Sequence, residues 1–192
     1  MRQFSKIVTN VFQYYTWVPI FIIAAVSQAG LRTEHNKTTI IILHLVDVLA
    51  PILVYIFLLN GGRIKDANLI KREDRPQLFA ITTSLVFFAT VISYFLGSLL
   101  FFQLHLIVFI FMLTMTVITM FFKISAHMFI NTFFVFILNY LYDWQLLWLF
   151  LIVPIVAFAR LNLKAHTRVE VILGTIVGFC EPYLMLKIFK LL

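Results

Sequence analysis

The sequence predicts an all-α membrane protein, a polytopic bundle of six to seven transmembrane helices. Of its 192 residues, 62% are hydrophobic and only 12% are charged, far from the balance of a soluble globular chain. Several apolar stretches approach or exceed the ~20 residues that a helix needs to cross a bilayer. In such a chain, excess Lys and Arg set topology or meet anionic headgroups. The net charge of +7 therefore does not indicate a nucleic-acid partner.

Five long spans and one short apolar hairpin are expected. The long spans cover about Val11–Gly30, Thr38–Leu59, Leu78–Leu96, Leu99–Phe122 and Val169–Phe189. Between His127 and Arg160 lie only 32 residues, nearly all apolar, with a turn expected around Asp143. Two helices of about 16 residues reach only ~24 Å each, less than the ~30 Å hydrocarbon core. This hairpin either crosses a thinned bilayer or has polar ends that lie below the headgroup plane.

The N-terminus has two interpretations. Arg2 and Lys6 precede an apolar run that ends in Ser27-Gln28-Ala29, a pattern like that of a cleaved signal peptide. The polar start is long, however, and the next apolar stretch follows almost at once. We therefore expect a retained first helix.

Three polar segments interrupt the apolar sequence. The first contains Lys71–Pro76, the second is Lys123–His127 and the third is Ala159–Glu170. Two expected spans separate the first segment from the second, and two more separate the second from the third. All three should therefore emerge on the same face of the membrane, as a composite site requires.

Together these segments offer residues suited to phosphoryl transfer: Lys71, Arg72, Arg75, Ser125, His127, Arg160, His166 and Glu170. Cations neutralise phosphate and donate several hydrogen bonds to it. One histidine can attack phosphorus while another protonates the leaving oxygen. Glu170 lies four residues after His166, on the same helical face, and can accept a hydrogen bond from one ring nitrogen. Alternatively, Thr167 and Glu170 form a capping box, and Glu170 then only caps the last helix.

The order of these residues resembles the motifs of the type 2 phosphatidic acid phosphatase family. Ser125 and His127 match the end of its Pro-Ser-Gly-His motif, and Arg75-Pro76 matches the end of its first motif. Arg160, His166 and Glu170 follow its last motif, in which arginine, histidine and an acid are separated by five and three residues. The resemblance covers about Lys71 to the C-terminus.

The resemblance implies a metal-independent lipid phosphatase without a cofactor. His166 would be the nucleophile that forms a phosphohistidine, Glu170 would orient it, and His127 would be the general acid. Four cations and one hydroxyl would hold the phosphate: Lys71, Arg72, Arg75 and Arg160, with Ser125 as the hydroxyl. Implied substrates are membrane lipids such as phosphatidic acid, phosphatidylglycerophosphate, polyprenyl pyrophosphate or lipid A. Independently of the family, the histidines lack the spacing of a zinc site.

The chain departs from the family pattern at several positions. Asn68 stands where the family has its lysine, so Lys71 or Lys65 must replace it; Ile124, Ala126 and Ala159 stand where it has proline, glycine and serine. These departures leave open a relative that binds, scaffolds or transports lipid phosphates without efficient turnover. A third possibility is a proton-coupled transporter that uses ionisable residues within the spans. These residues are His44 and Asp47, three residues apart on one helical face, and Glu181. For all three, and for His105 in another span, structural pairing inside the bundle is the alternative.

Residues 1–192 are expected to form a single integral membrane domain. Two N-terminal spans, residues 11–59, would precede a phosphatase-like core over about residues 63–192. We expect a multi-pass protein of a bacterial inner membrane. Positive-inside logic places the polar segments in the cytoplasm, whereas bacterial relatives commonly work on the periplasmic face. The sequence leaves this orientation, the lipid and the oligomeric state open.

Overall fold

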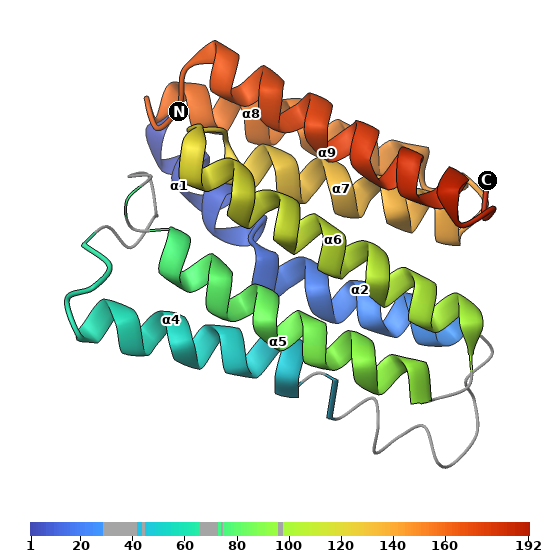
Figure 1. Cartoon of the computed structure of the whole chain (residues 1–192). Helices are drawn as coiled ribbons and strands as arrows, with labels where there is room; N and C mark the ends of the chain where they lie inside the picture. Colours follow the sequence, from blue (N-terminus) through green and yellow to red (C-terminus); the bar gives the residue numbers. More distant parts are fainter. Residues whose placement is uncertain (29–41, 44, 66–72, 74, 96–97) are drawn as a thin grey trace. The chain divides into compact units, whose positions relative to one another are not determined.

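The computed structural model describes residues 1–28, 42–43, 45–65, 73, 75–95 and 98–192. Over these residues the chain is helical and has no strand, which confirms the predicted all-α class (Figure 1). The α-helices are α1 (Arg2–Val11), α2 (Tyr14–Gln28), α4 (Ala50–Asn60), α5 (Pro76–Phe95), α6 (Leu99–Phe121), α7 (Ala126–Leu141), α8 (Ile152–Asn162) and α9 (Arg168–Ile188). A π-helical segment, η1 (Leu45–Leu49), precedes α4, and a 3₁₀ segment, η3 (Leu147–Leu151), precedes α8.

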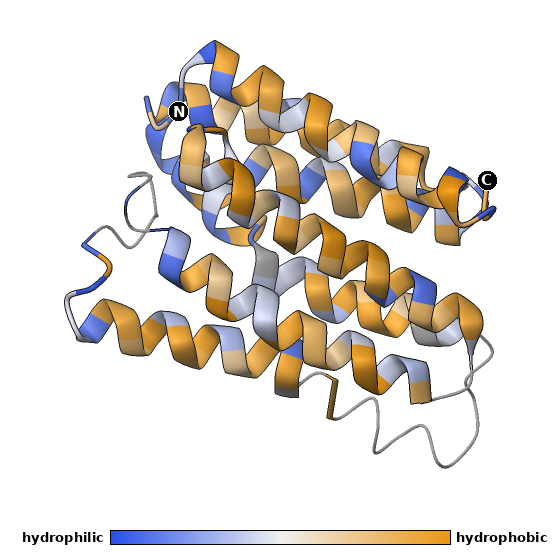
Figure 2. Ribbon diagram, viewed as in Figure 1, coloured by the Kyte–Doolittle hydropathy of each residue, from blue (hydrophilic) through white to orange (hydrophobic). Residues whose placement is uncertain are grey.

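Three of the described helices, α5, α6 and α9, are long and apolar enough to cross a membrane. Their bounds agree closely with three of the predicted spans, and Figure 2 shows apolar residues along most of their length. Helices α1 and α2 would make a fourth span if they are counted together. The other apolar helices are shorter, so the structure supports three to four membrane-crossing elements among the described residues.

The chain divides into two compact units. The first contains Met1–Trp17 and Lys123–Leu192, and the second contains Val18–Phe122. The division falls within α2, at a point between Trp17 and Val18. Each unit is described below by itself.

The second unit is built on an antiparallel pair of helices, α5 and α6. Ser98 caps α6, and its side chain accepts a hydrogen bond from the backbone N–H of Phe101. Thr83 and Thr116 share a hydroxyl hydrogen bond of 2.8 Å, and the Thr90 hydroxyl donates to the carbonyl oxygen of His105 at 3.3 Å. Such interhelical hydrogen bonds satisfy polar groups that no water can reach.

In the first unit, α7 and α9 run side by side in the same direction (Figure 1). Two glycines four residues apart on α9 allow this approach. A Cβ atom at Gly174 would lie 2.6 Å from the carbonyl oxygen of Ser125, and one at Gly178 would lie 2.6 Å from that of Phe129. The matched spacing fixes the register of the two helices, as small residues spaced by four do in membrane helix pairs.

The short hairpin between His127 and Arg160 has the predicted turn and one predicted helix. Helix α7 has 16 residues, and the turn after it places Asp143 and Trp144 at positive φ values of 49° and 62°. The second half of the hairpin is not one 16-residue α-helix. It begins as the 3₁₀ segment η3 and continues as α8. Pro154 explains part of this difference, because it has no N–H to donate to the carbonyl of Phe150.

The N-terminal region differs from the prediction of one helix that begins at Val11. The polar start is itself a helix, α1, and α2 begins only after Phe12 and Gln13. Asn131 of α7 holds this break: its amide nitrogen donates to the carbonyl oxygen of Phe12 at 3.1 Å. The amide oxygen of Asn131 accepts a hydrogen bond from Nε1 of Trp17 at 2.8 Å. The periodicity of apolar residues within one helix does not predict contacts between residues this far apart in the chain.

Candidate active site

The starts of α7 and α9 bring the second and third polar segments together. The backbone N–H of Ser125 donates to the carbonyl oxygen of Glu170 at 3.0 Å. Gly174, one turn further along α9, packs directly against the same end of α7. Two helix N-termini, a kind of position that favours anions, therefore start beside one another.

His166 lies in the turn between α8 and α9 and is paired with Glu170. Its Nδ1 atom is 2.6 Å from Oε2 of Glu170, and the imidazole is only 1% exposed. Lys164 has a φ of 52°, a left-handed conformation that helps the chain to reverse direction just before His166. Because the carboxylate engages Nδ1, chemistry at this imidazole would take place at Nε2.

Glu170 fulfils both of the roles considered from the sequence. The Thr167 hydroxyl accepts from the backbone N–H of Glu170 at 3.3 Å, and Oε2 of Glu170 accepts from the backbone N–H of Thr167 at 3.4 Å. This is the capping box. The same oxygen is 2.6 Å from His166, so capping and histidine pairing are not exclusive.

Lys123 is a further cation beside this pair. Its Nζ atom lies 3.5 Å from Oε2 of Glu170, and its side chain is 38% exposed. Lys123 belongs to the second polar segment, but its role was not anticipated from the sequence.

Ser125 and His127 occupy the first turn of α7. Ser125 is the N-cap, and its buried side chain accepts a hydrogen bond from the backbone N–H of Met128 at 3.4 Å. His127 is buried, and its carbonyl oxygen accepts a hydrogen bond from the Asn131 amide at 2.7 Å. Asn131 thus ties the first turn of α7 to the break between α1 and α2.

Arg160 lies in the last turn of α8 and is only 1% exposed. Its Nη1 atom donates to the Thr9 hydroxyl of α1 at 3.4 Å. Two residues later, the Asn162 amide donates to the Ser5 hydroxyl of α1 at 2.9 Å. The N-terminal helix therefore positions the arginine of the third polar segment, a role that its sequence did not reveal.

The structure describes the first polar segment only in part. Lys71 and Arg72 fall outside the described residues, and Arg75 is a buried residue of the second unit, immediately before α5. His44 also lies outside the described residues. Its expected neighbour Asp47, on η1, instead approaches His105 of α6, with 3.6 Å between Oδ2 and Nε2. Glu181 is buried in α9, beside Pro182.

The described residues contain no group of three or more His, Cys, Asp or Glu side chains that could hold a metal ion. No protein-family model matches the chain, and no curated protein or solved structure matches it either. Among the described residues, His166 and Glu170 are the pair whose chemistry bears most directly on function.

Proposed function

We propose that the chain is a membrane phosphatase that hydrolyses a phosphomonoester or pyrophosphate of a lipid through a phosphohistidine at His166. The observation that carries this proposal is the short contact between Nδ1 of His166 and Oε2 of Glu170 at the start of α9. A carboxylate in this position fixes the tautomer and the orientation of an imidazole and stabilises the positive charge that develops on it.

The proposed reaction has two steps. In the first, Nε2 of His166 attacks phosphorus, the bond from phosphorus to the leaving oxygen breaks, and His127 gives its proton to that oxygen. In the second, water attacks the phosphohistidine, His127 takes a proton from the water, and the bond from phosphorus to Nε2 breaks. Phosphate leaves, and both histidines return to their starting states.

Charge on the transferring phosphoryl group requires donors around it. In the first unit these are Arg160, Ser125 and the backbone N–H groups at the start of α7. The family resemblance adds Arg75, Lys71 and Arg72 of the first polar segment. Lys123 is a further cation close to the His166–Glu170 pair.

We propose a lipid substrate because the site lies among apolar helices. In this proposal the short helices α4, α7 and α8 also lie within the membrane, which gives six to seven spans in a bacterial inner membrane. The acyl or prenyl chains would stay in the bilayer while the phosphate enters laterally. Short helices place their polar ends below the headgroup plane, where a lipid phosphate can reach them.

The test is phosphate release by the purified protein in detergent from phosphatidic acid and from polyprenyl pyrophosphate. His166→Ala should lower kcat by at least ~10³-fold, because it removes the proposed nucleophile. His127→Ala should lower kcat on the lipid by about 10²–10⁴-fold, the usual contribution of a general acid. Unchanged activity of both variants would exclude the mechanism.

A substrate with a good leaving group separates the two histidines. Release of p-nitrophenolate in the first step needs no proton, so His127→Ala should slow the initial burst of p-nitrophenolate much less than it slows the first step with a lipid phosphate. The second step, in which His127 is the base, is slowed alike for both substrates. His166→Ala should lose activity on both. Equal losses for the two variants on both substrates would contradict the assignment of His127 as the acid.

The second candidate is a protein that binds lipid phosphates without turnover. Ala159, where the family has a serine, is fully buried in an apolar cluster with Val156 and Met128, so no hydroxyl is available at that position. Retained binding of phosphatidic acid by pure protein, without phosphate release under any condition above, would favour this function over hydrolysis.

A further inference from the structure

Helix α1 has three faces of different chemistry. At 100° per residue, the first face holds Ser5, Val8 and Thr9, which are buried. The second face is apolar and exposed: Phe4 is 50% exposed, Ile7 56% and Val11 48%. The third face is polar and exposed, and its residues are Arg2, Gln3, Lys6 and Asn10.

The buried face attaches α1 to the rest of the first unit. Ser5 and Thr9 bond to Asn162 and Arg160, the last residues of α8. Val8 packs in the apolar cluster that includes Val156 of α8. The helix is therefore held in a fixed rotation, and its other two faces point away from the helices of its own unit.

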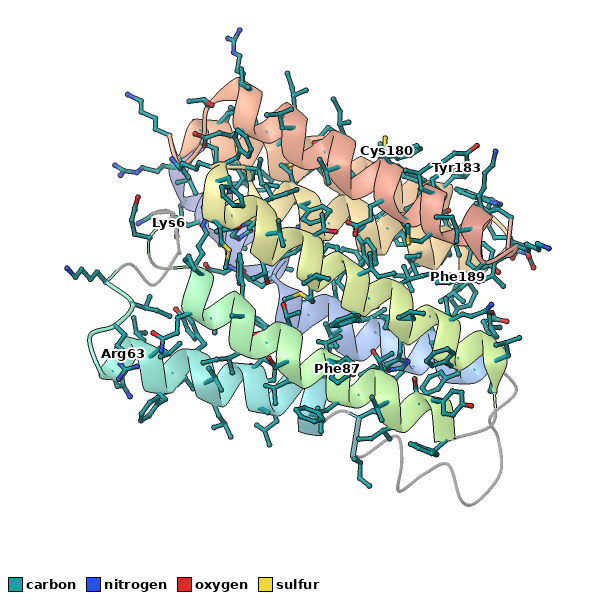
Figure 3. The ribbon with its side chains drawn as sticks, in the orientation of Figure 1. Lys6, Arg63, Phe87, Cys180, Tyr183 and Phe189 are labelled. Atoms are coloured by element: carbon teal, nitrogen blue, oxygen red, sulfur yellow. The ribbon has the colours of Figure 1, made fainter. Side chains whose placement is uncertain are left out.

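Those two faces fit the boundary between a bilayer and water. A run of three large apolar side chains next to cations is the pattern of a helix that lies in the plane of a membrane surface. With 10 residues, α1 is ~15 Å long and cannot cross the hydrocarbon core by itself. Arg2 and Lys6 are both exposed, and their charges complement an anionic surface. Lys6 is labelled in Figure 3.

We infer that α1 is an interfacial helix, with Phe4, Ile7 and Val11 among the acyl chains and Arg2 and Lys6 against anionic lipid headgroups. The bonds from Ser5 and Thr9 then set the end of α8, and with it Arg160, at headgroup depth. This inference does not depend on phosphatase activity. It would hold equally for a protein that only binds lipid phosphates.

The depth of α1 can be measured with spin labels in the full-length protein. Cys180 is the only cysteine and is exposed, so Cys180→Ser provides a cysteine-free background (Figure 3). Ile7→Cys places a label on the apolar face, and Gln3→Cys places the matched control on the polar face. In vesicles of phosphatidylcholine and phosphatidylglycerol, the label at position 7 should collide several-fold more with oxygen than with a water-soluble nickel chelate. The label at position 3 should show the reverse.

Each other pattern overturns the inference. Strong nickel collisions at both positions would place α1 in water. Strong oxygen collisions at both would make α1 the start of a bent span with α2. Low collisions with both reagents at position 7, together with spin–spin broadening, would show that a second copy of the chain covers this face.

The role of the cations is tested by varying the lipid. The label at position 7 should become less accessible to the nickel chelate as the phosphatidylglycerol fraction rises, and Arg2→Gln combined with Lys6→Gln should abolish this change. Lys187→Gln combined with Lys190→Gln, which removes the same charge from the end of α9, should retain it. If the original chain shows no dependence on phosphatidylglycerol, or if both double variants lose it, anionic lipid is not the partner of Arg2 and Lys6.

Discussion

The chain contains two histidine–carboxylate pairs in different surroundings. In the first unit, Nδ1 of His166 is 2.6 Å from Oε2 of Glu170, in a turn that leads into a helix. In the second unit, Nε2 of His105 is 3.6 Å from Oδ2 of Asp47, and His105 lies within a helix long enough to cross a membrane. The distance between His166 and Glu170 is that of a strong hydrogen bond, whereas the distance between His105 and Asp47 is too long for one.

The two imidazole–carboxylate pairs also have different neighbours. Glu170 is also approached by Lys123 and by the backbone N–H of Thr167. His105 is surrounded by the rings of Phe101 and Phe21, at centroid distances of 4.4 and 6.0 Å. Cations and helix starts suit an anionic substrate, whereas aromatic rings suit packing. The same two functional groups are therefore expected to serve turnover in one unit and stability in the other.

Removing the charge of each carboxylate should give the largest contrast. Glu170→Gln keeps the shape of the side chain but can no longer stabilise a positive imidazole, so kcat should fall by on the order of 10²–10⁴-fold. Asp47→Asn should leave kcat within about threefold of the original, because no step uses it. The measurement is initial phosphate release in detergent. A large loss of phosphate release from Asp47→Asn alone would contradict the structural role of the second pair.

The first pair also depends on the close packing of α7 against α9. Gly174→Ala would place a methyl group 2.6 Å from the carbonyl oxygen of Ser125, so the start of α7 must move. A displacement of about 1 Å at a catalytic group can lower the rate by ~10²-fold. Thr175→Ala, at the next position on α9, is the matched control and should leave kcat nearly unchanged. Equal activity of both variants would show that the register of α7 and α9 does not matter for turnover.

The sequence was informative where a feature is local. Three of the five predicted long spans, α5, α6 and α9, follow from apolar length. The contact between His166 and Glu170 follows from a spacing of four residues at a helix start. Long-range contacts were not predictable: the bond from Trp17 to Asn131 crosses 114 positions, and that from Arg160 to Thr9 crosses 151. Periodicity describes one helix at a time and cannot show which helix lies opposite. For the same reason Asp47 was first considered with His44, its neighbour in sequence, and not with His105.

Removing His105 should test the structural role of the second pair. His105→Leu introduces an apolar side chain of similar size and leaves the Asp47 carboxylate in its buried position without the imidazole. Breaking a buried pair in this way lowers the free energy of unfolding by about 3–5 kcal/mol. The measurement is unfolding in detergent micelles followed by circular dichroism. Adding Asp47→Asn to His105→Leu should recover part of the lost free energy of unfolding, because it replaces the carboxylate with a neutral amide. A further decrease in the double variant would contradict the pairing of Asp47 with His105.

The smallest effect should come from Thr167→Ala, which separates the two roles of Glu170. The variant loses the hydroxyl that accepts from the backbone N–H of Glu170, and loss of such a cap lowers the free energy of unfolding by about 1 kcal/mol. The carboxylate can still engage Nδ1 of His166, so kcat should change by less than about fivefold, far less than in Glu170→Gln. Unfolding and phosphate release are measured on the same preparation. A fall in kcat as large as that of Glu170→Gln would mean that the cap, and not the carboxylate charge, positions His166.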